Sequence, residues 1–362
     1  MTDHKYCVIL AGGLGTRFWP ISKEEKPKQF RRVWKYETSF LQETFARMVR
    51  TFSADHIFVA TLARYKDLVK EQLPDLPEGN IILEPYGRNT APSIAYSATL
   101  LKSRDPEAVM VVVPADHDIC NYALFGQTIE SAISYVSDHD VLLTLGIVPT
   151  RPDTNFGYIQ ATGGRQAFDS NTPVKVKTFT EKPDEELAKV FYDSGEFLWN
   201  SGIFIWKASV LMKEMALCCP EIATLWTGWD EAEDKDAFVR KAYSDCPRTS
   251  IDYALMEKSD NVWLQPAKFG WSDLGSWSTL YEFASGETGD GNAVWCRGKQ
   301  IIKETGNSLI IGTESGKLTV VQGLEDYMVI DTDDVLLVCP RGDRTFQEIL
   351  SEIALPQYGD YR

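Results

Sequence analysis

Short apolar runs and segments of helical spacing alternate along the first half of the chain. The apolar runs are rich in Val and Ile and occupy residues 7–10, 56–61, 80–83, 109–114 and 141–147. Unbroken apolar runs of this length are typical of strands that are buried on both faces. Amphipathic segments separate them at residues 39–52, 65–73 and 90–101. This alternation predicts an α/β fold, in which helices flank a Rossmann-like mixed sheet that is mostly parallel.

The pattern changes after about residue 290. Before that point the chain still mixes strand-like segments (158–162, 174–180) with helical ones (185–194, 251–258). Beyond it, short strand-like pieces alternate with Gly, Asn and Asp turns at 300–303, 308–311, 318–321, 327–330 and 335–338. Their regular spacing predicts a small β-solenoid-like domain that resembles a left-handed β-helix, with a small barrel as the alternative.

These changes predict three parts of the chain. An α/β domain spans residues 1–285, a β-rich domain spans 290–342, and a helix with a tail spans 343–362. A length of 362 residues is enough for about two domains with separate cores.

The charge balance narrows the possible partners. The chain has 37 Lys and Arg against 52 Asp and Glu, a net charge of −15, which repels nucleic-acid phosphates and anionic lipids. The longest apolar stretches, 108–114 and 141–148, are far shorter than the roughly 18 residues of a membrane span. The first ten residues reach a glycine loop too early for a signal peptide. We therefore expect a cytoplasmic protein with no nucleic-acid or membrane partner.

A glycine loop follows the first apolar run. Its Gly12, Gly13 and Gly15 allow backbone N–H groups to approach phosphate oxygens, and Arg17 adds a fork of donors. A tight turn without a ligand is the alternative interpretation. The loop lacks the dinucleotide fingerprint, because Phe18 stands where a third glycine is needed, and it has no Walker A spacing. Nicotinamide-dependent enzymes and P-loop ATPases are thus disfavoured.

Charged residues near strand ends suggest further phosphate chemistry. Lys28 lies in a proline-stiffened segment soon after the glycine loop, where it either reaches the same phosphates or is simply solvated. Asp116 ends the most apolar run and Asp273 lies in a Trp-Ser-Asp-Leu-Gly turn. Two such carboxylates suit Mg²⁺, which takes one or two of them with phosphate oxygens and water. Each aspartate is alternatively a helix cap or a turn former.

A second polar run follows the third apolar segment. Glu84 lies at the predicted strand end and residues 87–90 lead into a helix. A carboxylate there accepts hydrogen bonds from an exocyclic amine and a ring N–H, and guanine has both donors. A simply capped helix is the alternative.

The glycine loop and the following Pro-Lys-Gln-Phe resemble the signature of sugar-1-phosphate nucleotidyltransferases. Similar motifs occur in the expected order at residues 84–92, 114–117, 156–159, 179–183, 199–204, 250–253 and 271–277. The resemblance covers roughly residues 8 to 280. It implies the nucleotide-diphospho-sugar transferase fold and the Mg²⁺-dependent, in-line reaction of GTP with α-D-mannose 1-phosphate to GDP-mannose and diphosphate. Longer relatives append an isomerase domain, which we do not expect here.

The resemblance also implies roles for individual residues. The catalytic residues are Arg17, Lys28, Asp116 and Asp273, of which the two aspartates hold Mg²⁺. The nucleotide-binding residues are Leu10, Gly12, Gly13, Gly15, Thr16, Glu84, Arg88, Asn89, Thr90 and Pro114. The sugar-phosphate residues are Gly157, Tyr158, Glu181, Lys182 and Asn200. A homodimer formed through the β-rich domain is expected.

Two alternatives to this function stay open. One is an enzyme of the same fold that uses another sugar 1-phosphate or another nucleoside triphosphate. The other is a non-catalytic relative that senses nucleotide sugars, although retention of the four catalytic residues argues against it. An assay of all four nucleotides for diphosphate release separates these possibilities.

Overall fold

A computed structural model describes residues 4–34, 36–169, 172–285 and 290–362. The chain divides into two compact units, and neither is continuous in sequence. Unit 1 contains Met1–Gly13, Thr44–Ala115 and Ile119–Trp271, and unit 2 contains Leu14–Glu43, Asp116–Asp118 and Ser272–Arg362. Among the described helices, none combines the length and the apolar character that crossing a bilayer requires.

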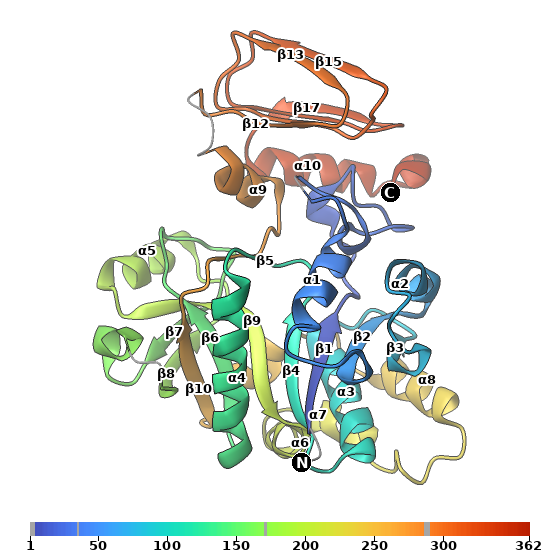
Figure 1. Ribbon diagram of the computed structural model, residues 1–362, viewed down its shortest axis with the longest axis vertical. Coiled ribbons are helices and arrows are strands. Elements are labelled where there is room, and N and C mark those ends of the chain that lie inside the picture. The colour runs from blue at the N-terminus through green and yellow to red at the C-terminus, as the bar shows by residue number, and fades with distance from the viewer. Residues whose placement is uncertain (1–3, 35, 170–171, 286–289) are drawn as a thin grey trace. The chain divides into compact units, whose positions relative to one another are not determined.

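Unit 1 is built on one nine-stranded sheet in the order β3-β2-β1-β4-β9-β6-β10-β8-β7 (Figure 1). Its strands are β1 (Lys5–Leu10), β2 (Ile57–Leu62), β3 (Ile81–Glu84), β4 (Val109–Pro114), β6 (Leu142–Ile147), β7 (Tyr158–Ala161), β8 (Val174–Thr180), β9 (Phe197–Lys207) and β10 (Val262–Ala267). Strands β1 to β4 run parallel, as do β6 and β10. Two-residue strands, β5 (Asp118–Ile119) and β11 (Trp271–Ser272), occur where the chain passes from one unit to the other.

The sheet is mixed, as predicted, but parallel pairs do not predominate in it, so the expectation that it is mostly parallel was wrong. Strand β9 pairs antiparallel with β4, β6 and β7 in the middle of the sheet, and β8 is antiparallel to β7 and β10. The physical reason is that an unbroken apolar run reports burial on both faces and contains no information on strand direction.

Helices cover both faces of this sheet. Figure 1 shows α4 in front of it, with α3, α6 and α7 together behind. The helices of unit 1 are α2 (Lys66–Gln72), α3 (Thr90–Arg104), α4 (Tyr122–Asp138), α5 (Glu185–Ser194), α6 (Ala208–Cys218), α7 (Pro220–Ala223) and α8 (Lys235–Asp245). Asp252–Met256 forms a single π-helical turn. The parallel part places the carboxyl ends of β1, β2, β3 and β4 at one edge, where open α/β sheets bind ligands.

Unit 2 combines an early segment of the chain with its C-terminal part. Helix α1 (Phe40–Met48) begins in unit 2 and ends in unit 1. The C-terminal elements are α9 (Trp277–Ala284), β12 (Ala293–Cys296), β13 (Lys299–Lys303), β14 (Leu309–Gly312), β15 (Leu318–Gln322), β16 (Tyr327–Asp331), β17 (Leu336–Pro340) and α10 (Asp343–Ile353). Phe18, Trp19 and Ile21 of the early segment share one buried cluster with Trp277 of α9 and Ile330 of β16. The two segments therefore have a common core.

Two small sheets make up the β-rich part of unit 2. Strands β12, β14 and β16 are parallel neighbours, and β17 adds antiparallel to β16. Strands β13 and β15 form a separate parallel pair. Ile310, Val321 and Val329 from the two sheets share a second buried cluster, so the sheets face each other, as Figure 1 shows.

Candidate functional site

Lys28 is the centre of a charged cluster in unit 2. Its Nζ lies 2.5 Å from Asp116 Oδ2, donates to the carbonyl of Leu274 at 3.2 Å, and lies 5.1 Å from the centre of the Phe18 ring. The lysine is 6% exposed, and its backbone N–H donates to Ser22 Oγ at 2.9 Å. Lys28 is therefore a fixed positive charge rather than a solvated one.

Asp116 is held in its ionised form by this lysine. Burial is the largest single influence and works against ionisation, but the attraction of Lys28 and His117, together with the hydrogen bonds that the carboxylate accepts, outweighs it and holds the pKa of Asp116 below its ordinary value. The side chain keeps 26% of its surface exposed, so an ionised carboxylate at this position is accessible to a cation or a substrate.

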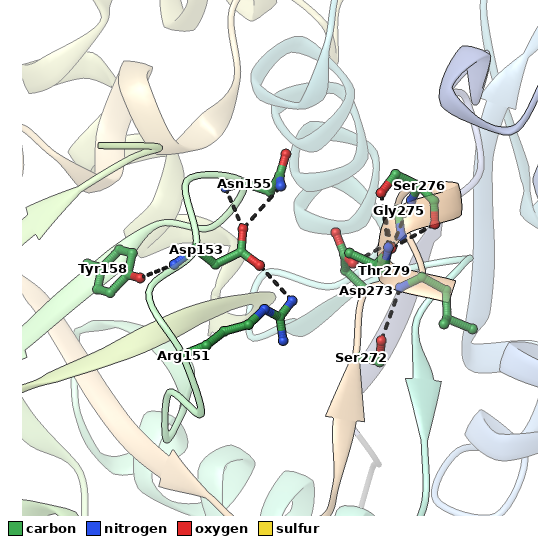
Figure 2. A network of polar contacts seen from close by, with 10 residues as sticks. Arg151, Asp153, Asn155, Tyr158, Ser272, Asp273, Gly275, Ser276 and Thr279 are labelled. Carbon is green, nitrogen blue, oxygen red and sulfur yellow. Dashed lines mark hydrogen bonds and ion pairs between the residues drawn. The ribbon is translucent and has the colours of Figure 1, made fainter. Parts of the chain in front are cut away.

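The Asp273 carboxylate is positioned by a tight turn before α9 (Figure 2). Its Oδ1 accepts a hydrogen bond from the Gly275 N–H at 3.0 Å, and Ser276 with Thr279 forms the capping box that begins α9. A Cβ placed on Gly275 would lie 2.5 Å from Asp273 Oδ2 and 3.1 Å from Nη2 of Arg17. The glycine thus lets the carboxylate and the guanidinium approach the same point of the backbone.

The four residues predicted as catalytic all lie in unit 2 and are linked by these contacts. Lys28 contacts Asp116 and the residue after Asp273, while Arg17 and Asp273 both approach Gly275. Across the residues that the structure describes, no group of three or more His, Cys, Asp and Glu side chains is placed to hold a metal. Two carboxylates without Cys or His suit a hard cation that takes its other ligands from phosphate and water, not zinc.

The glycine loop leads from β1 of unit 1 into unit 2. Gly15 has φ +60°, and a Cβ there would lie 2.7 Å from Lys28 Cγ and 2.9 Å from Ser22 Oγ. The loop therefore needs glycine at this position for both its conformation and its packing. Gly13 and Thr16 are exposed. The backbone of Gly12 approaches Glu84, because a Cβ on residue 12 would lie 3.1 Å from Glu84 Oε1.

Glu84, at the end of β3, is a buried carboxylate. It is 4% exposed, and it accepts hydrogen bonds from Ser93 Oγ at 2.9 Å and from Tyr243 OH at 3.1 Å. Burial raises the pKa of Glu84 to about 7, against the effect of these two hydrogen bonds. The residue therefore titrates near neutral pH.

The rest of the predicted base-binding run is attached to the last turn of α8 and to the segment that follows it. Arg88 donates from Nε to the carbonyl of Tyr243 at 3.0 Å and from Nη2 to that of Ser244 at 3.2 Å. Asn89 caps α3 with φ +71°, and Thr90 Oγ1 accepts from the Ile251 N–H at 2.9 Å. Leu10 and Pro114, at the ends of β1 and β4, are paired strand neighbours. The run is thus a braced strand-to-helix turn.

The predicted sugar-phosphate residues meet in a different part of unit 1. A Cβ on Gly157 would lie 2.3 Å from Glu181 Oε2 and 3.2 Å from the Cβ of Asn200. Lys182 Nζ pairs with Glu181 Oε1 at 3.0 Å and is 51% exposed, whereas the Glu181 side chain is 8% exposed. Within the described part of the chain, Glu181 Oε2 is buried without a hydrogen-bond partner. A buried acceptor of this kind points to a ligand that donates hydrogen bonds.

Asp252 belongs to this group and was not assigned a role from the sequence. Its Oδ1 accepts from Asn200 Nδ2 at 2.9 Å, while Asn200 Oδ1 accepts from Thr144 Oγ1 at 3.1 Å. Burial, reinforced by the charge of Asp252, raises the pKa of Glu181 to about 7. The motif at 250–253 contributed to the resemblance. However, the residues around Asp252 contain no local signal that its carboxylate contacts Asn200, which lies 52 residues away in the sequence.

Tyr158 does not share the surroundings of Glu181. It is fully buried in a cluster with Phe156 and Trp199, and its hydroxyl accepts a hydrogen bond from the Asp153 N–H at 2.9 Å (Figure 2). Asp153 in turn pairs with Arg151 at 2.7 Å. The Tyr158 side chain therefore anchors the loop that precedes β7.

Comparisons with known proteins agree on the kind of protein. The nucleotidyl transferase family model matches residues 6–288. A mannose-1-phosphate guanylyltransferase from Escherichia coli is 38% identical over 345 residues, which cover 92% of this chain and 72% of that protein.

Two solved structures are also similar to this chain. A mannose-1-phosphate geranyltransferase from Thermus thermophilus has a TM-score of 0.84 at 23% identity, covering 97% of this chain and 98% of that one. A mannose-6-phosphate isomerase from Helicobacter pylori has a TM-score of 0.61 at 26% identity, covering 75% and 100%. The first likeness confirms the α/β nucleotide-sugar transferase fold.

Proposed function

Because the chain belongs to the nucleotidyl transferase family, we propose that it catalyses the reaction of GTP with α-D-mannose 1-phosphate to GDP-mannose and diphosphate. One observation carries this choice of substrates: a guanylyltransferase named for mannose 1-phosphate is 38% identical over 92% of the chain. The geometry described above suits the chemistry, because a fixed lysine, an arginine and two carboxylates gather beside a glycine loop.

The reaction requires no nucleophile from the protein. The attacking oxygen of a sugar phosphate is already ionised, so the enzyme's task is to position two anions and to neutralise charge in the transition state. Lys28, which is held in place by Asp116 and Leu274, and Arg17 bind the nucleotide phosphates. Lys182, half exposed, binds the phosphate of the sugar.

Asp116 and Asp273 are proposed to hold Mg²⁺. The ionised state of Asp116 and the hard-oxygen chemistry of the pair support this assignment. When bound, the ion supplies Lewis-acid polarisation and charge neutralisation at phosphate oxygens. Lys28 already neutralises Asp116, so ion binding requires the substrate phosphates to attract that ammonium away from the carboxylate.

The two binding regions divide the substrates. The braced run from Glu84 to Thr90, together with Leu10, Pro114 and the glycine loop, binds the nucleoside and its phosphates. Gly157, Glu181 and Asn200 bind the sugar, with Glu181 Oε2 as an acceptor for a hydroxyl. Tyr158 contributes from the core by fixing the loop before Gly157.

The assembly and the domain boundaries are further proposals. We propose a homodimer formed through the β-rich part, a catalytic domain at 1–285, a left-handed β-helix-like domain at 290–342, and a C-terminal helix and tail at 343–362. The parallel ladders β12-β14-β16 and β13-β15 support the solenoid, because stacked coils pair in parallel.

Sedimentation velocity of the full chain tests whether the protein is a homodimer. The cytoplasmic location stays a prediction.

The decisive experiment is diphosphate release across all pairs of four nucleoside triphosphates and several sugar 1-phosphates, with and without Mg²⁺. We expect turnover to be highest with GTP and mannose 1-phosphate, with about 100-fold or greater preference over the other bases. Equal turnover with dTTP contradicts the substrate assignment, and binding without turnover identifies a sensor. Isomerisation of mannose 6-phosphate is measured in parallel, since one similar structure is named for it.

A further inference from the structure

A single π-helical turn, Asp252–Met256, contacts two of the proposed sugar-binding residues of unit 1. The Glu257 N–H donates to the Asp252 carbonyl at 3.0 Å, which is the i to i+5 hydrogen bond of such a turn. At one end of the turn, the Asp252 carboxylate accepts from Asn200 of β9 at 2.9 Å. At the other end, the Glu257 carboxylate accepts from the backbone N–H of Glu181 at 2.8 Å. Isolated π-helical turns are frequent at functional sites, and this one is attached on both sides to the sugar-binding residues.

The contacts of Asn200 fix the orientation of its side-chain amide. Its Oδ1 accepts from Thr144 Oγ1 and from the Gly202 N–H, each at 3.1 Å, and its Nδ2 donates to Asp252. A backbone N–H only donates and a carboxylate oxygen only accepts, so turning the amide over would break the contacts on both sides. An amide has two N–H donors and two acceptor lone pairs. Among the described residues, these contacts therefore leave one N–H of Asn200 available to a ligand.

The available N–H selects the chemistry of the group that it binds. Asn200 keeps part of its surface exposed, so a ligand can reach its side chain. The N–H donates, so the ligand must present an acceptor, and a sugar hydroxyl oxygen is one. Burial raises the pKa of Asp252, and the nearby charge of Lys182 acts against this shift. The same region thus offers a hydroxyl-binding donor close to a cation that suits a phosphate.

We propose that Asp252 is a positioning residue for the sugar: it holds the Asn200 amide so that the remaining N–H donates to one hydroxyl oxygen of the bound hexose 1-phosphate. This inference rests on the proposed function. It assigns the selectivity for one hydroxyl group to an acid that does not itself contact the sugar. Glu257 fixes the other end of the turn against the backbone of Glu181, so the Asp252 carboxylate is held in place from both sides.

The test compares variants of Asp252 in steady-state assays with mannose 1-phosphate and GTP varied in turn. Asp252→Leu and Asp252→Ala both remove the acceptor, and Ala does so without adding bulk. Each should raise the KM for mannose 1-phosphate about tenfold or more and leave the KM for GTP within about twofold of the wild-type value. Asp252→Asn keeps an acceptor oxygen and should return the KM for mannose 1-phosphate to within about threefold of the wild-type value.

Asp260→Leu is the matched control, because Asp260 is an exposed acid beyond the turn. It should have the KM values of the wild type. Circular dichroism and thermal unfolding show whether each variant is folded.

Selectivity among deoxy sugars separates positioning from a purely structural role, which would not change which hydroxyl group is recognised. The KM is measured for the monodeoxy analogues of mannose 1-phosphate, with Asn200→Ala as the reference variant. In the wild type, the analogue that lacks the acceptor for Asn200 should have a KM about tenfold above that of mannose 1-phosphate. Asn200→Ala and Asp252→Leu should both lose this difference, at the same position of the sugar ring.

The inference is overturned if Asp252→Leu and Asp252→Ala keep the wild-type KM for mannose 1-phosphate, or if Asp252→Asn raises it as much as they do. It is also overturned if Asp252→Leu retains the selectivity that Asn200→Ala loses. These results leave the proposed function in place, because the wild type still turns over the sugar phosphate. A wild type that neither binds nor turns over any hexose 1-phosphate instead overturns the proposed function, and the inference with it.

Discussion

At the scale of single residues, the charged cluster depends on Lys28. Its ammonium group is buried, and the Asp116 carboxylate, the Leu274 carbonyl and the face of Phe18 replace the lost water. A buried ion pair adds little net stability, but removal of one partner leaves an unpaired buried charge. The two aspartates of the cluster should therefore respond differently to the same substitution.

Asp116→Asn and Asp273→Asn should each lower kcat by at least about 100-fold, since each removes a charge from the phosphate-binding cluster. Asp116→Asn should also lower the free energy of unfolding by about 2 kcal/mol, because Lys28 loses its counterion; the cost is below the roughly 3–5 kcal/mol of a fully buried pair because Asp116 is 26% exposed. Asp273→Asn should leave stability unchanged, since Asn keeps the oxygen that accepts from the Gly275 N–H. The measurements are Mg²⁺-dependent turnover and urea unfolding.

The double variant Asp116→Asn/Asp273→Asn tests whether both aspartates bind the same Mg²⁺ ion. If both aspartates act through one Mg²⁺, it should be little slower than either single variant, because effects through one group are not additive. Near wild-type turnover in Asp273→Asn, with an unshifted Mg²⁺ requirement, would remove Asp273 from the metal site.

Variants of the two cationic regions should change different kinetic constants. Lys182→Ala should raise the KM for mannose 1-phosphate more than the KM for GTP, whereas Arg17→Ala should impair turnover with GTP. Lys182 is half exposed, so its removal leaves the fold intact. Steady-state kinetics with each substrate varied in turn measures the split, and the reverse pattern would show that the two halves of the site are exchanged.

Glu84 should make stability depend on pH. Its pKa is raised from 4.5 to about 7 in the folded state, so the folded chain binds the proton more tightly than the unfolded chain does. The resulting stabilisation is complete below about pH 4.5 and is lost as the pH rises through about 7. Glu84→Gln, which does not titrate, should gain about 3 kcal/mol relative to the wild type between pH 4.5 and 8.

Urea unfolding of both proteins across this range measures the difference. Taking the difference removes the titration of Glu181, which both proteins share and whose pKa lies in the same window. Parallel pH profiles for the two proteins would show that Glu84 is not the titrating group.

At the scale of elements, the sugar region depends on how closely three strands approach. Gly157 lies just before β7, Glu181 follows β8, and Asn200 lies within β9. A Cβ on residue 157 would lie 2.3 Å from Glu181 Oε2. The loop before β7 can therefore pack against the carboxylate only because residue 157 is glycine.

Gly157→Ala should therefore displace the Glu181 carboxylate and raise the KM for mannose 1-phosphate about tenfold, with little change in the KM for GTP. Gly79→Ala is the matched control, because nothing lies within 4 Å of a Cβ there. Equal KM values in Gly157→Ala and the wild type would exclude Glu181 from sugar binding.

At the scale of the whole molecule, each of the two units is built from separate stretches of the sequence. Phe18, Trp19 and Ile21, which follow the glycine loop, are buried in one cluster with residues of the C-terminal strands and α10. The boundary proposed near residue 285 therefore separates two patterns in the sequence but divides a shared core.

A fragment of residues 1–285 should consequently lose the packing partners of this early segment. We expect it to expose apolar surface, to bind a hydrophobic dye, and to have no transferase activity, since Arg17 and Lys28 lie within the affected segment. The full-length chain is the control. A fragment that unfolds cooperatively and retains turnover would show that the segment folds without the C-terminal core.

The amino-acid sequence alone determined the local features of this protein. Apolar runs and helical spacing are properties of neighbouring residues, so β4, β8 and α5 have the bounds that the patterns predict. The glycine loop, with its need for glycine at Gly15, is also a local property. The ordered motifs indicated the family, which the comparisons confirm.

Only the tertiary structure decided which distant residues meet. The antiparallel position of β9, the contact of Asp252 with Asn200, and the burial of Lys28 between Asp116 and Leu274 join positions 52 to 246 residues apart. No local periodicity contains such pairings, because they depend on strand direction and on the packing of whole elements.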